Sequence, residues 1–366
     1  MSSGDAGPVS KGPSRVAVDA MGGDRAPGEV VRGVLEAAAE FPVFVYLVGR
    51  EAEVRREVEL ASGSIPSNVE IVDATEVVEM HDHPLAPIRK KKNSSIRVCA
   101  DLVGAGKADA FVSAGNTGAA WTSARTVLGM IEGVDRPALA AVVPHHDGHT
   151  VLLDVGANVD SKPHHLREFS VMGHFYAQML FNLRSPRIGL LSIGEEEGKG
   201  NELTRQTFRV MKETGLNFIG NAEGRDVYNG NADVVVCDGF IGNVVLKASE
   251  ALAEMVGRLL REELRANPLR QVGALLASGA FSALKRRTDY SEYGGAPLLG
   301  VRGGCVVCHG RSSAKAIKNA VRGAGDFAAS RINDKIHAKV NELHQKELAE
   351  GLQAGNGESG DEVALP

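Results

Sequence analysis

The chain has 366 residues, of which 43% are hydrophobic and 24% charged, and its formal net charge is -5. These values are typical of a soluble globular protein with a full core, and the acidic balance argues against a nucleic-acid partner. No stretch reaches the ~18 apolar residues that a membrane span needs. Residues 1–14 are rich in Ser, Gly and Pro without an apolar core, so we expect a disordered segment, no signal peptide and a cytoplasmic protein with reduced cysteines.

Short apolar runs alternate with amphipathic segments along most of the chain. Helices are predicted over residues 27–39, 51–60 and 120–128. The alternation predicts one α/β domain over residues 15–349, with a mainly parallel sheet covered on both faces. Strands are predicted over residues 15–20, 42–49, 69–72, 108–112, 138–143, 150–153, 187–192, 217–219 and 232–237.

The loop at residues 113–119, with the sequence SAGNTGA, joins a predicted strand to a predicted helix. Glycine lets main-chain N–H groups approach a ligand, and a helix start adds unpaired donors and a partial positive charge. Asn116, Thr117 and Gly118 are therefore candidates for binding phosphate or an oxyanion. An ordinary tight turn is the alternative on these residues alone.

Three further loops rich in Gly and Asn follow predicted strands, at residues 154–158, 194–201 and 238–243. The carboxyl ends of parallel strands share one edge of a sheet, so we expect the four loops to converge on one crevice. Turn formation is the alternative explanation for their Asn and Gly residues.

Several patterns point to other functions and are rejected. Cys305, Cys308 and His309 match a haem-attachment motif, but a cytoplasmic setting favours buried strand cysteines. Residues 194–199 are one residue short of a P-loop, and no G-x-G-x-x-G follows the first strand. We expect no metal and no cofactor, because turn and cap roles explain the loop aspartates better than Mg²⁺ does. These aspartates are Asp19, Asp24, Asp154 and Asp238.

The pattern changes near residue 248. Apolar residues then recur at helical spacing, Pro268 interrupts them, and residues 271–284 carry no charge. This predicts a helical arm over about 248–287. A long helix is predicted from residue 313 towards 349, and residues 350–366 are expected to form a disordered acidic tail.

Six motifs within about residues 15–325 together resemble those of the bacterial phosphate acyltransferases. They are residues 18–24 (VDAMGGD), 113–119, 153–158, 193–201, 237–243 with Leu246 and Lys247, and 289–296 (DYSEYGGA). The resemblance implies transfer of a long-chain acyl group from acyl carrier protein to inorganic phosphate. The acyl phosphate would then pass to a membrane glycerol-3-phosphate acyltransferase of phospholipid synthesis. It also implies a three-layer α/β/α sandwich like isopropylmalate dehydrogenase and phosphotransacetylase, in a homodimer.

That reaction needs a seat for phosphate, donors for the oxyanion and a way for thiolate to leave. Phosphate is itself a nucleophile, so direct attack needs no acyl-enzyme. Lys199 is the candidate cation, with a solvated surface lysine as the alternative. Asn158 and Asn243 are candidate amide donors, and His309 is a candidate proton donor or else a structural histidine.

Two surfaces are predicted to bind partners. The basic run Arg89, Lys90, Lys91 and Lys92 is interpreted as a docking patch for the acidic carrier protein, with a solvated helix face as the alternative. The arm is expected to contact the inner face of the cell membrane peripherally, with packing in the dimer or the core as the alternative. The proposed membrane-contacting residues are Val272, Leu275, Leu276, Phe281 and Leu284.

Three other functions remain open from sequence alone. The first is a short-chain phosphotransacetylase that uses acyl-CoA. The second is a decarboxylating dehydrogenase of the same fold, which would need NAD and a divalent metal. The third is a non-catalytic peripheral membrane scaffold, which would not need a converging polar crevice.

Overall fold

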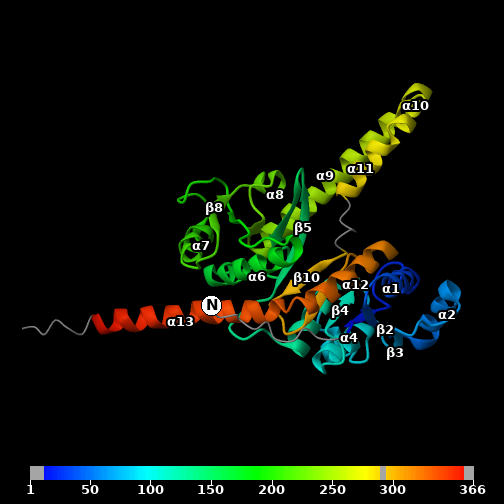
Figure 1. Ribbon diagram of the computed structural model, residues 1–366, viewed down its shortest axis with the longest axis horizontal. Coiled ribbons are helices and arrows are strands. Elements are labelled where there is room, and N and C mark those ends of the chain that lie inside the picture. Colours follow the sequence, from blue (N-terminus) through cyan, green and yellow to red (C-terminus); the bar gives the residue numbers. More distant parts are fainter. Residues whose placement is uncertain (1–11, 289–293, 358–366) are drawn as a thin grey trace, which may run out of the picture.

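A computed structural model describes residues 12–288 and 294–357, and these form one eleven-stranded sheet with helices on both faces (Figure 1). The strand order is β3-β2-β1-β4-β11-β10-β5-β6-β9-β7-β8. The predicted α/β fold with a mainly parallel sheet is confirmed. The strands are β1 (Ser14–Asp19), β2 (Val43–Gly49), β3 (Val69–Asp73), β4 (Ala110–Ser113), β5 (Ala138–His145), β6 (Gly148–Leu153), β7 (Ile188–Leu191), β8 (Phe218–Ala222), β9 (Val234–Val236), β10 (Ala296–Leu299) and β11 (Gly304–Val307).

Helices cover the two faces of the sheet as separate layers. α1, α12, α6 and α13 pack on one face, and α4, α5, α8 and the start of α9 pack on the other. The helices of the main body are α1 (Gly28–Glu40), α2 (Glu51–Ser62), α3 (Ala86–Arg89), α4 (Ser95–Gly104), α5 (Thr117–Ser123) followed by a π-helical segment (Ala124–Leu128), α6 (Pro163–Phe181), α7 (Glu202–Lys212), α8 (Asp226–Asn229), α12 (Ala314–Ala329) and α13 (Ile332–Gly357).

The sheet consists of two halves that run in opposite directions. Strands β3, β2, β1, β4 and β11 are mutually parallel, and so are β6, β9, β7 and β8. The pairs β11–β10, β10–β5 and β5–β6 between them are antiparallel. Because each antiparallel pair reverses the direction, the carboxyl ends of the two halves do not share one edge. That part of the sequence prediction is wrong.

The strand register nevertheless brings the ends of β4 and β6 close together. The two strands run in opposite directions. When the pairings are followed across β5, β10 and β11, the last residue of β6 lies level with Val112, which directly precedes the last residue of β4. The loops after both strands therefore begin over the same central strands. The pairs that define this register are Leu153–Ala140, Leu139–Leu298, Pro297–Val306 and Val306–Val112.

Two predicted helical segments differ from the structure. The helix expected from residue 313 to 349 is two helices, because Arg331 adopts a left-handed conformation with φ 51°. This turn lets α13 bury Ile332, Ile336 and Val340 in the core beside α6. α13 continues to Gly357, into the segment expected to be disordered; residues 1–11, 289–293 and 358–366 lie outside the described part of the chain.

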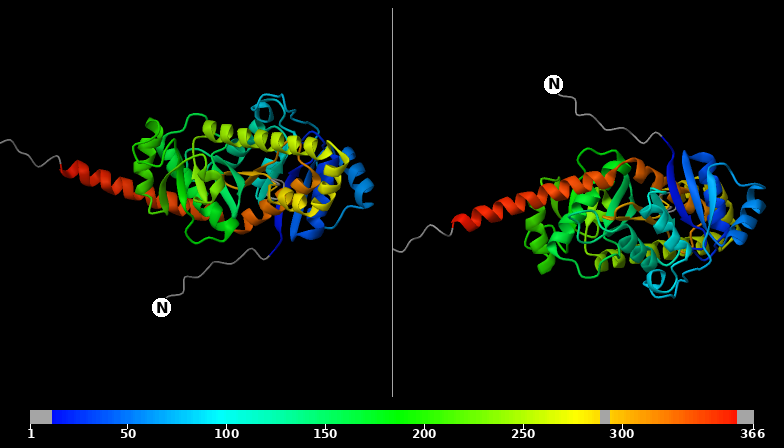
Figure 2. Two further views of the ribbon diagram at one scale, coloured as in Figure 1. Left: turned by 90° about the horizontal axis from the view of Figure 1, so that it is seen from above. Right: turned by 90° about the horizontal axis from the view of Figure 1, so that it is seen from below.

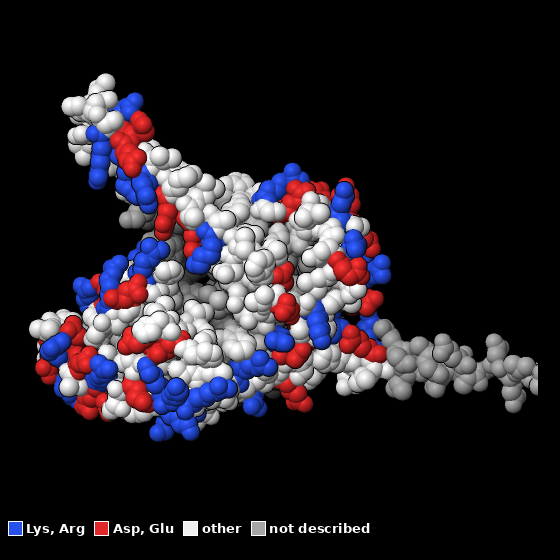
Figure 3. Space-filling model, turned by 180° about the vertical axis from the view of Figure 1, so that it is seen from behind, with Lys and Arg blue, Asp and Glu red and all other residues white. Residues whose placement is uncertain are grey.

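The arm stands out from the body (Figure 1). It consists of α9 (Gly239–Arg265), α10 (Pro268–Leu276) and α11 (Ser278–Thr288), so its helix begins nine residues earlier than the expected 248. Figure 3 shows mostly uncharged side chains at its tip. Over the described residues, no helix combines the length and apolar character needed to cross a membrane.

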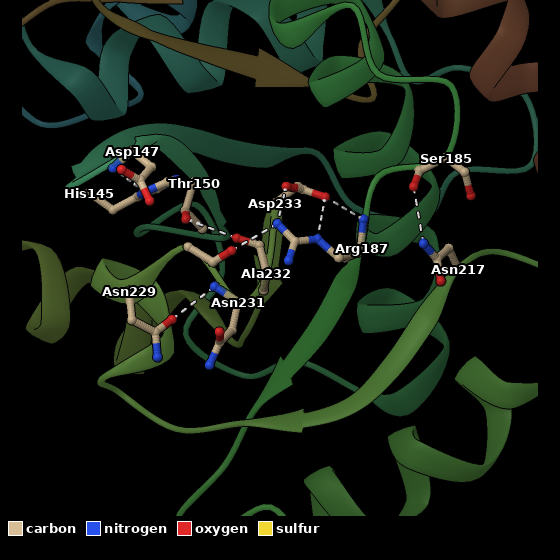
Figure 4. A network of polar contacts seen from close by, with 11 residues as sticks. His145, Asp147, Thr150, Ser185, Arg187, Asn217, Asn229, Asn231, Ala232 and Asp233 are labelled. Carbon is tan, nitrogen blue, oxygen red and sulfur yellow. Dashed lines mark hydrogen bonds and ion pairs between the residues drawn. The ribbon is translucent and has the colours of Figure 1, made fainter.

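At the amino ends of the strands, Arg–Asp pairs join neighbouring strands in both halves. Arg187 precedes β7, and its guanidinium Nη2 lies 2.8 Å from Oδ1 of Asp233, which precedes β9 (Figure 4). In the other half, Nη2 of Arg15 in β1 lies 2.7 Å from Oδ1 of Asp109, just before β4. These pairs lie at the ends opposite to the glycine-rich loops.

Candidate active site

An apolar cavity of about 400 Å³ lies over the central strands, between α5 and the loop after β6. Its floor is made by Leu139, Leu298 and Val307 from β5, β10 and β11. Thr117 and Gly118 border it on one side, and the loop after β6 borders it on the other. The remaining lining residues are Pro84, Leu85, Trp121, Thr122, Gly156 and Ala157.

The buried Asn116 fixes the start of α5 at the border of the cavity, but its own side chain is already hydrogen-bonded within the protein. Its Oδ1 accepts a hydrogen bond from the Ala119 amide at 3.0 Å and so caps α5. Its Nδ2 donates to main-chain carbonyl oxygens of residues 79, 80 and 82 at 3.0–3.3 Å. Within the described residues, the amides of Thr117 and Gly118 have no hydrogen-bond acceptor. The free donors are therefore these two amides rather than the predicted side chain.

Asp154 organises the loop after β6. Its buried carboxylate accepts hydrogen bonds from the amides of Leu139, Gly156, Ala157 and Asn158 at 2.8–3.2 Å, and from Nδ2 of Asn158 at 2.9 Å. Burial raises the pKa of Asp154, and these donors oppose the rise. The cap role expected for this aspartate fits the geometry.

Asn158 differs from its predicted role as a donor. Its Nδ2 already donates to Asp154 and to the carbonyl oxygen of Pro137 at 2.7 Å. Both partners are acceptors, which fixes the orientation of the amide. Its buried Oδ1 has no partner within the described residues. Asn158 therefore offers an acceptor to its surroundings, not an N–H group.

The start of α9 packs directly against the Asp154 loop. The segment predicted as the loop 238–243 is instead the capped first turns of this helix, with Asp238 as the N-cap. A Cβ atom on Gly242 would lie 1.9 Å from the carbonyl oxygen of Asp154, so only glycine allows this approach. The contact puts the exposed Asn243 beside Gly156, at the rim of the cavity.

The loops after β7 and β9 meet at a second apolar cavity of about 360 Å³. Its lining includes Ser192, Gly200, Asn201 and Ile241. Lys199 belongs to this loop but lines neither cavity; it is exposed, and its ammonium has no acidic partner within the described residues. The four loops thus border two cavities instead of the single predicted crevice. The loops after β4 and β6 border the first cavity, and the segments after β7 and β9 border the second.

His309 follows β11 two residues after Val307, which lines the first cavity. The imidazole is exposed, and its Nδ1 accepts a hydrogen bond from the Arg311 amide at 3.1 Å. A neutral ring in this arrangement carries its proton on Nε2. His309 lies near the cavity floor but is not among the residues that line it.

Two parts of the cavity wall are not among the residues predicted from the sequence. Pro84 and Leu85 come from the loop between β3 and α3, whose apolar residues show no periodicity. Trp121 lies on α5, and its buried indole N–H has no partner within the described residues. It is the one tryptophan in the sequence and follows a glycine-rich loop, and this pattern indicates a large apolar side chain at the site.

Other candidate groups are explained by packing. All four cysteines are buried free thiols, as expected, and burial raises the pKa of Cys308 to about 12. Asp135, His164 and His165 lie close enough together to hold a metal ion. However, Nδ1 of His165 accepts the Lys162 amide, and its Nε2 lies 2.7 Å from Oδ2 of Asp135. Hydrogen bonding therefore accounts for this cluster.

The four residues of the basic run differ in their exposure and in their partners. Arg89, Lys90 and Lys92 are exposed, and Figure 3 shows basic side chains gathered over this part of the body. Lys91 turns inward, where its Nζ lies 2.6 Å from Oδ2 of Asp82 and 2.7 Å from the carbonyl oxygen of Val77. Only three of the four predicted docking cations are thus free to meet a partner.

The architecture is that of known acyl-transferring enzymes. A phosphotransacetylase from Streptococcus pyogenes aligns with a TM-score of 0.60 at 16% identity, covering 87% of this chain and 93% of that one. A branched-chain phosphotransacylase from Enterococcus faecalis aligns with a TM-score of 0.52 at 14% identity, covering 87% and 99%. At these identities the likeness shows the fold: a phosphotransacetylase-like α/β/α sandwich.

Sequence comparison identifies the family within that class. A family profile described as "Fatty acid synthesis protein" matches residues 14–335. The phosphate acyltransferase of Pelotomaculum thermopropionicum is 50% identical over 332 residues, covering 91% of this chain and 96% of that protein. That of Aquifex aeolicus is 50% identical over 322 residues, covering 88% and 95%. The chain belongs to the phosphate acyltransferase family and is an acyltransferase, so the dehydrogenase and scaffold alternatives are wrong.

Proposed function

We propose that this enzyme transfers a long-chain fatty acyl group from the thioester of acyl carrier protein to inorganic phosphate. The observation that carries the proposal is an apolar cavity with two unpaired main-chain donors, on Thr117 and Gly118, at its edge. An alkyl chain suits the apolar walls, and N–H groups suit phosphate or an oxyanion. The product then serves phospholipid synthesis through a membrane glycerol-3-phosphate acyltransferase.

The chemistry requires no acyl-enzyme. An oxygen of HPO₄²⁻ attacks the thioester carbonyl carbon, the C–O bond forms, and the C–S bond breaks. The proton of the phosphate ends on the leaving thiolate, so the products are acyl phosphate and the free carrier thiol. Asn243 donates to the oxyanion from the rim, and His309 relays the proton. Lys199 lines neither cavity, so in this proposal it supplies positive charge for the phosphate dianion from its exposed loop beside the second cavity.

The second candidate is a short-chain phosphotransacetylase acting on acyl-CoA, which the fold of the solved relatives favours. The test incubates the purified protein with phosphate and either acyl carrier protein or CoA, each bearing acetyl to palmitoyl chains, and measures acyl phosphate. Palmitoyl carrier protein is expected to be used best. Exclusive turnover of acetyl-CoA would instead establish the short-chain reaction.

The role of Lys199 is tested in the same assay. Lys199→Ala is expected to lower turnover at least ~10²-fold, the scale of losing a charge stabiliser in a site. Lys212→Ala is the matched control, because Lys212 is exposed and paired with Glu197 at 2.7 Å. Near-normal turnover by a folded Lys199→Ala protein would remove Lys199 from the site.

The arm supports a homodimer and a membrane contact at different positions. Along α9, Leu252, Met255, Val256 and Leu259 are each more than half exposed, which is a large apolar surface for a helix in water. We call this apolar part of α9, from Leu252 to Leu259, the shaft of the arm, and we propose that a second copy of the chain covers it. In α10, Leu275 and Leu276 are 73% and 84% exposed at the tip, and arginines lie along α9 and α10. We propose that this tip rests on the inner face of the cell membrane, with Val272, Phe281 and Leu284 beside it.

Two charge substitutions separate these contacts. Leu275→Glu with Leu276→Glu is expected to abolish co-sedimentation with anionic liposomes while the dimer persists in analytical ultracentrifugation. Leu252→Glu with Leu259→Glu, on the shaft, is expected to dissociate the dimer. Equal liposome binding by the tip variant and the wild type would refute the membrane role of the tip. Loss of the dimer in the tip variant would favour packing instead.

A further inference from the structure

The loop of residues 77–93 connects the basic run to the apolar cavity. Its base is closed by a bridge between Glu76 and Ser94, and by the Asn93 amide, which donates to Oε2 of Glu76 at 2.8 Å. One limb carries Pro84 and Leu85 into the cavity wall. The other limb carries the exposed cations Arg89, Lys90 and Lys92, and Figure 2 shows the loop standing out from the body.

The Lys91 side chain links the two limbs of the loop, and we call its contacts with Asp82 and Val77 the brace. Its ammonium reaches from the basic limb to the Asp82 carboxylate at 2.6 Å and to the Val77 carbonyl oxygen at 2.7 Å. The Lys91 hydrogen bond lowers the pKa of Asp82, which stays ionised as the partner of the brace. The side chains of this pair remain 31% and 23% exposed, so an incoming charged group can compete for them.

The segment that carries Pro84 and Leu85 is held to the site through polar contacts. The Asn116 amide grips three of its carbonyl oxygens. Pro84 packs on Gly118, whose Cβ, if added, would lie 2.8 Å from Cγ of Pro84. The loop thus covers the first turn of α5, where the free Thr117 and Gly118 amides lie.

We propose that this loop is a lid opened by docking of an acidic carrier protein. Acidic groups of the partner bind Arg89, Lys90 and Lys92 and compete with Asp82 for Lys91. The brace then breaks, Pro84 and Leu85 move away from the cavity, and the acyl chain enters. This inference rests on the proposed function, since it assumes delivery of the acyl group by an acidic carrier.

Trp121 reports the lid directly, because it is the sole tryptophan of the chain and lines the same cavity as Leu85. The experiment titrates the full-length enzyme with tryptophan-free holo-acyl carrier protein that bears no acyl chain, and follows Trp121 emission. We expect a saturable shift that weakens as salt rises, because exposed charges are screened. Replacing Arg89, Lys90 and Lys92 together by Ala should raise the carrier concentration at half-saturation at least ~10-fold.

The brace is tested by Lys91→Met, with Asp82→Asn as a second variant that removes the same ion pair from the other side. Both should show the shifted emission without carrier, and a lower KM for palmitoyl-CoA, which brings no docking protein. Lys107→Met, at an exposed lysine beyond α4, is the matched control and should behave as wild type.

An unchanged Trp121 emission on adding carrier, in an enzyme that still forms acyl phosphate, would overturn the lid and leave the proposed function intact. Brace variants that keep wild-type emission and KM would do the same. If wild-type enzyme forms no acyl phosphate from palmitoyl carrier protein, the proposed function fails and the lid inference falls with it.

Discussion

Each half of the sheet has a buried aspartate at the carboxyl end of a strand, and the two aspartates have different roles. Asp19 ends β1, and it accepts hydrogen bonds from the Ser113 hydroxyl at 2.7 Å and the Met21 amide at 3.2 Å. Asp154 follows β6, and four main-chain amides and the Asn158 side chain converge on it. Burial raises the pKa of both carboxyls. The first aspartate joins two strands, whereas the second builds the loop that forms one wall of the cavity.

The largest expected effect comes from removing the second aspartate. Asp154→Ala leaves several buried N–H groups without acceptors, so we expect a loss of about 3 kcal/mol in unfolding free energy. The cavity wall collapses with the loop, and kcat/KM for acyl phosphate formation should fall on the order of 10³-fold. Urea unfolding and the acyl phosphate assay measure the two quantities.

Asp19→Ala is the matched variant in the other half. It removes a connection between strands β1 and β4 and leaves the cavity lining in place, so its effect on kcat/KM should be at least ~10-fold smaller than that of Asp154→Ala. If Asp19→Ala were the more damaging to kcat/KM, the assignment of the two aspartates would have to be reversed.

A second prediction concerns Glu168, which lies buried in α6 in the same half as Asp154. Its Oε2 accepts the Asp135 amide at 3.0 Å, and burial raises its pKa to about 7. The unfolded carboxyl titrates near 4.5. Between these pH values the folded state retains a proton that the unfolded state has lost, so unfolding free energy falls as pH rises from 4.5 to 7.

Glu168→Gln keeps the acceptor oxygen and removes the titration. The variant should lose this part of the pH dependence and be more stable than wild type above pH 7, by up to about 3 kcal/mol. Urea unfolding at several pH values measures the difference. Glu342→Gln, at an exposed residue paired with Lys339, should follow the wild-type curve. Parallel curves for Glu168→Gln and wild type would show that Glu168 does not titrate in this range.

The sequence predicted the layered fold well, because strands and helices are encoded locally. The buried runs at β1, β4, β6 and β9 are short, apolar and followed by glycine-rich loops, and each forms a strand. The direction of the second half was not predictable in this way. It depends on β10, which enters the middle of the sheet from far along the chain and reverses the pairing.

The roles of site residues were predicted less well, because they depend on distant partners. Asn116 was expected to bind ligand, but carbonyl groups more than thirty residues earlier occupy its amide. Gly239 and Gly242 disfavour a helix by intrinsic propensity, so their segment was interpreted as a loop. Their close contact with the Asp154 loop explains why glycine occurs there in spite of that propensity.

The smallest expected effect is on unfolding free energy. It concerns two substitutions that test whether the Arg–Asp pairs at the amino ends of the strands contribute equally in the two halves. Arg187→Met and Arg15→Met each remove a guanidinium from a carboxylate. The arginine side chains are 45% and 42% exposed, so solvent screens both pairs. The main-chain amide of each arginine still donates to the same carboxylate, at 2.7 Å for Asp233 and 2.8 Å for Asp109. We therefore expect each variant to lose only about 1 kcal/mol of unfolding free energy.

Arg187 also donates to the Gly230 carbonyl oxygen at 2.8 Å, so its loss should be slightly the larger of the two. Because both pairs lie at the ends of the strands away from the cavity, kcat/KM should stay within about twofold of wild type for both variants. A selective loss of activity in Arg187→Met would mean that the amino end of β7 is coupled to the loop that carries Lys199. The division between stabilising amino ends and functional carboxyl ends would then hold in the first half of the sheet alone.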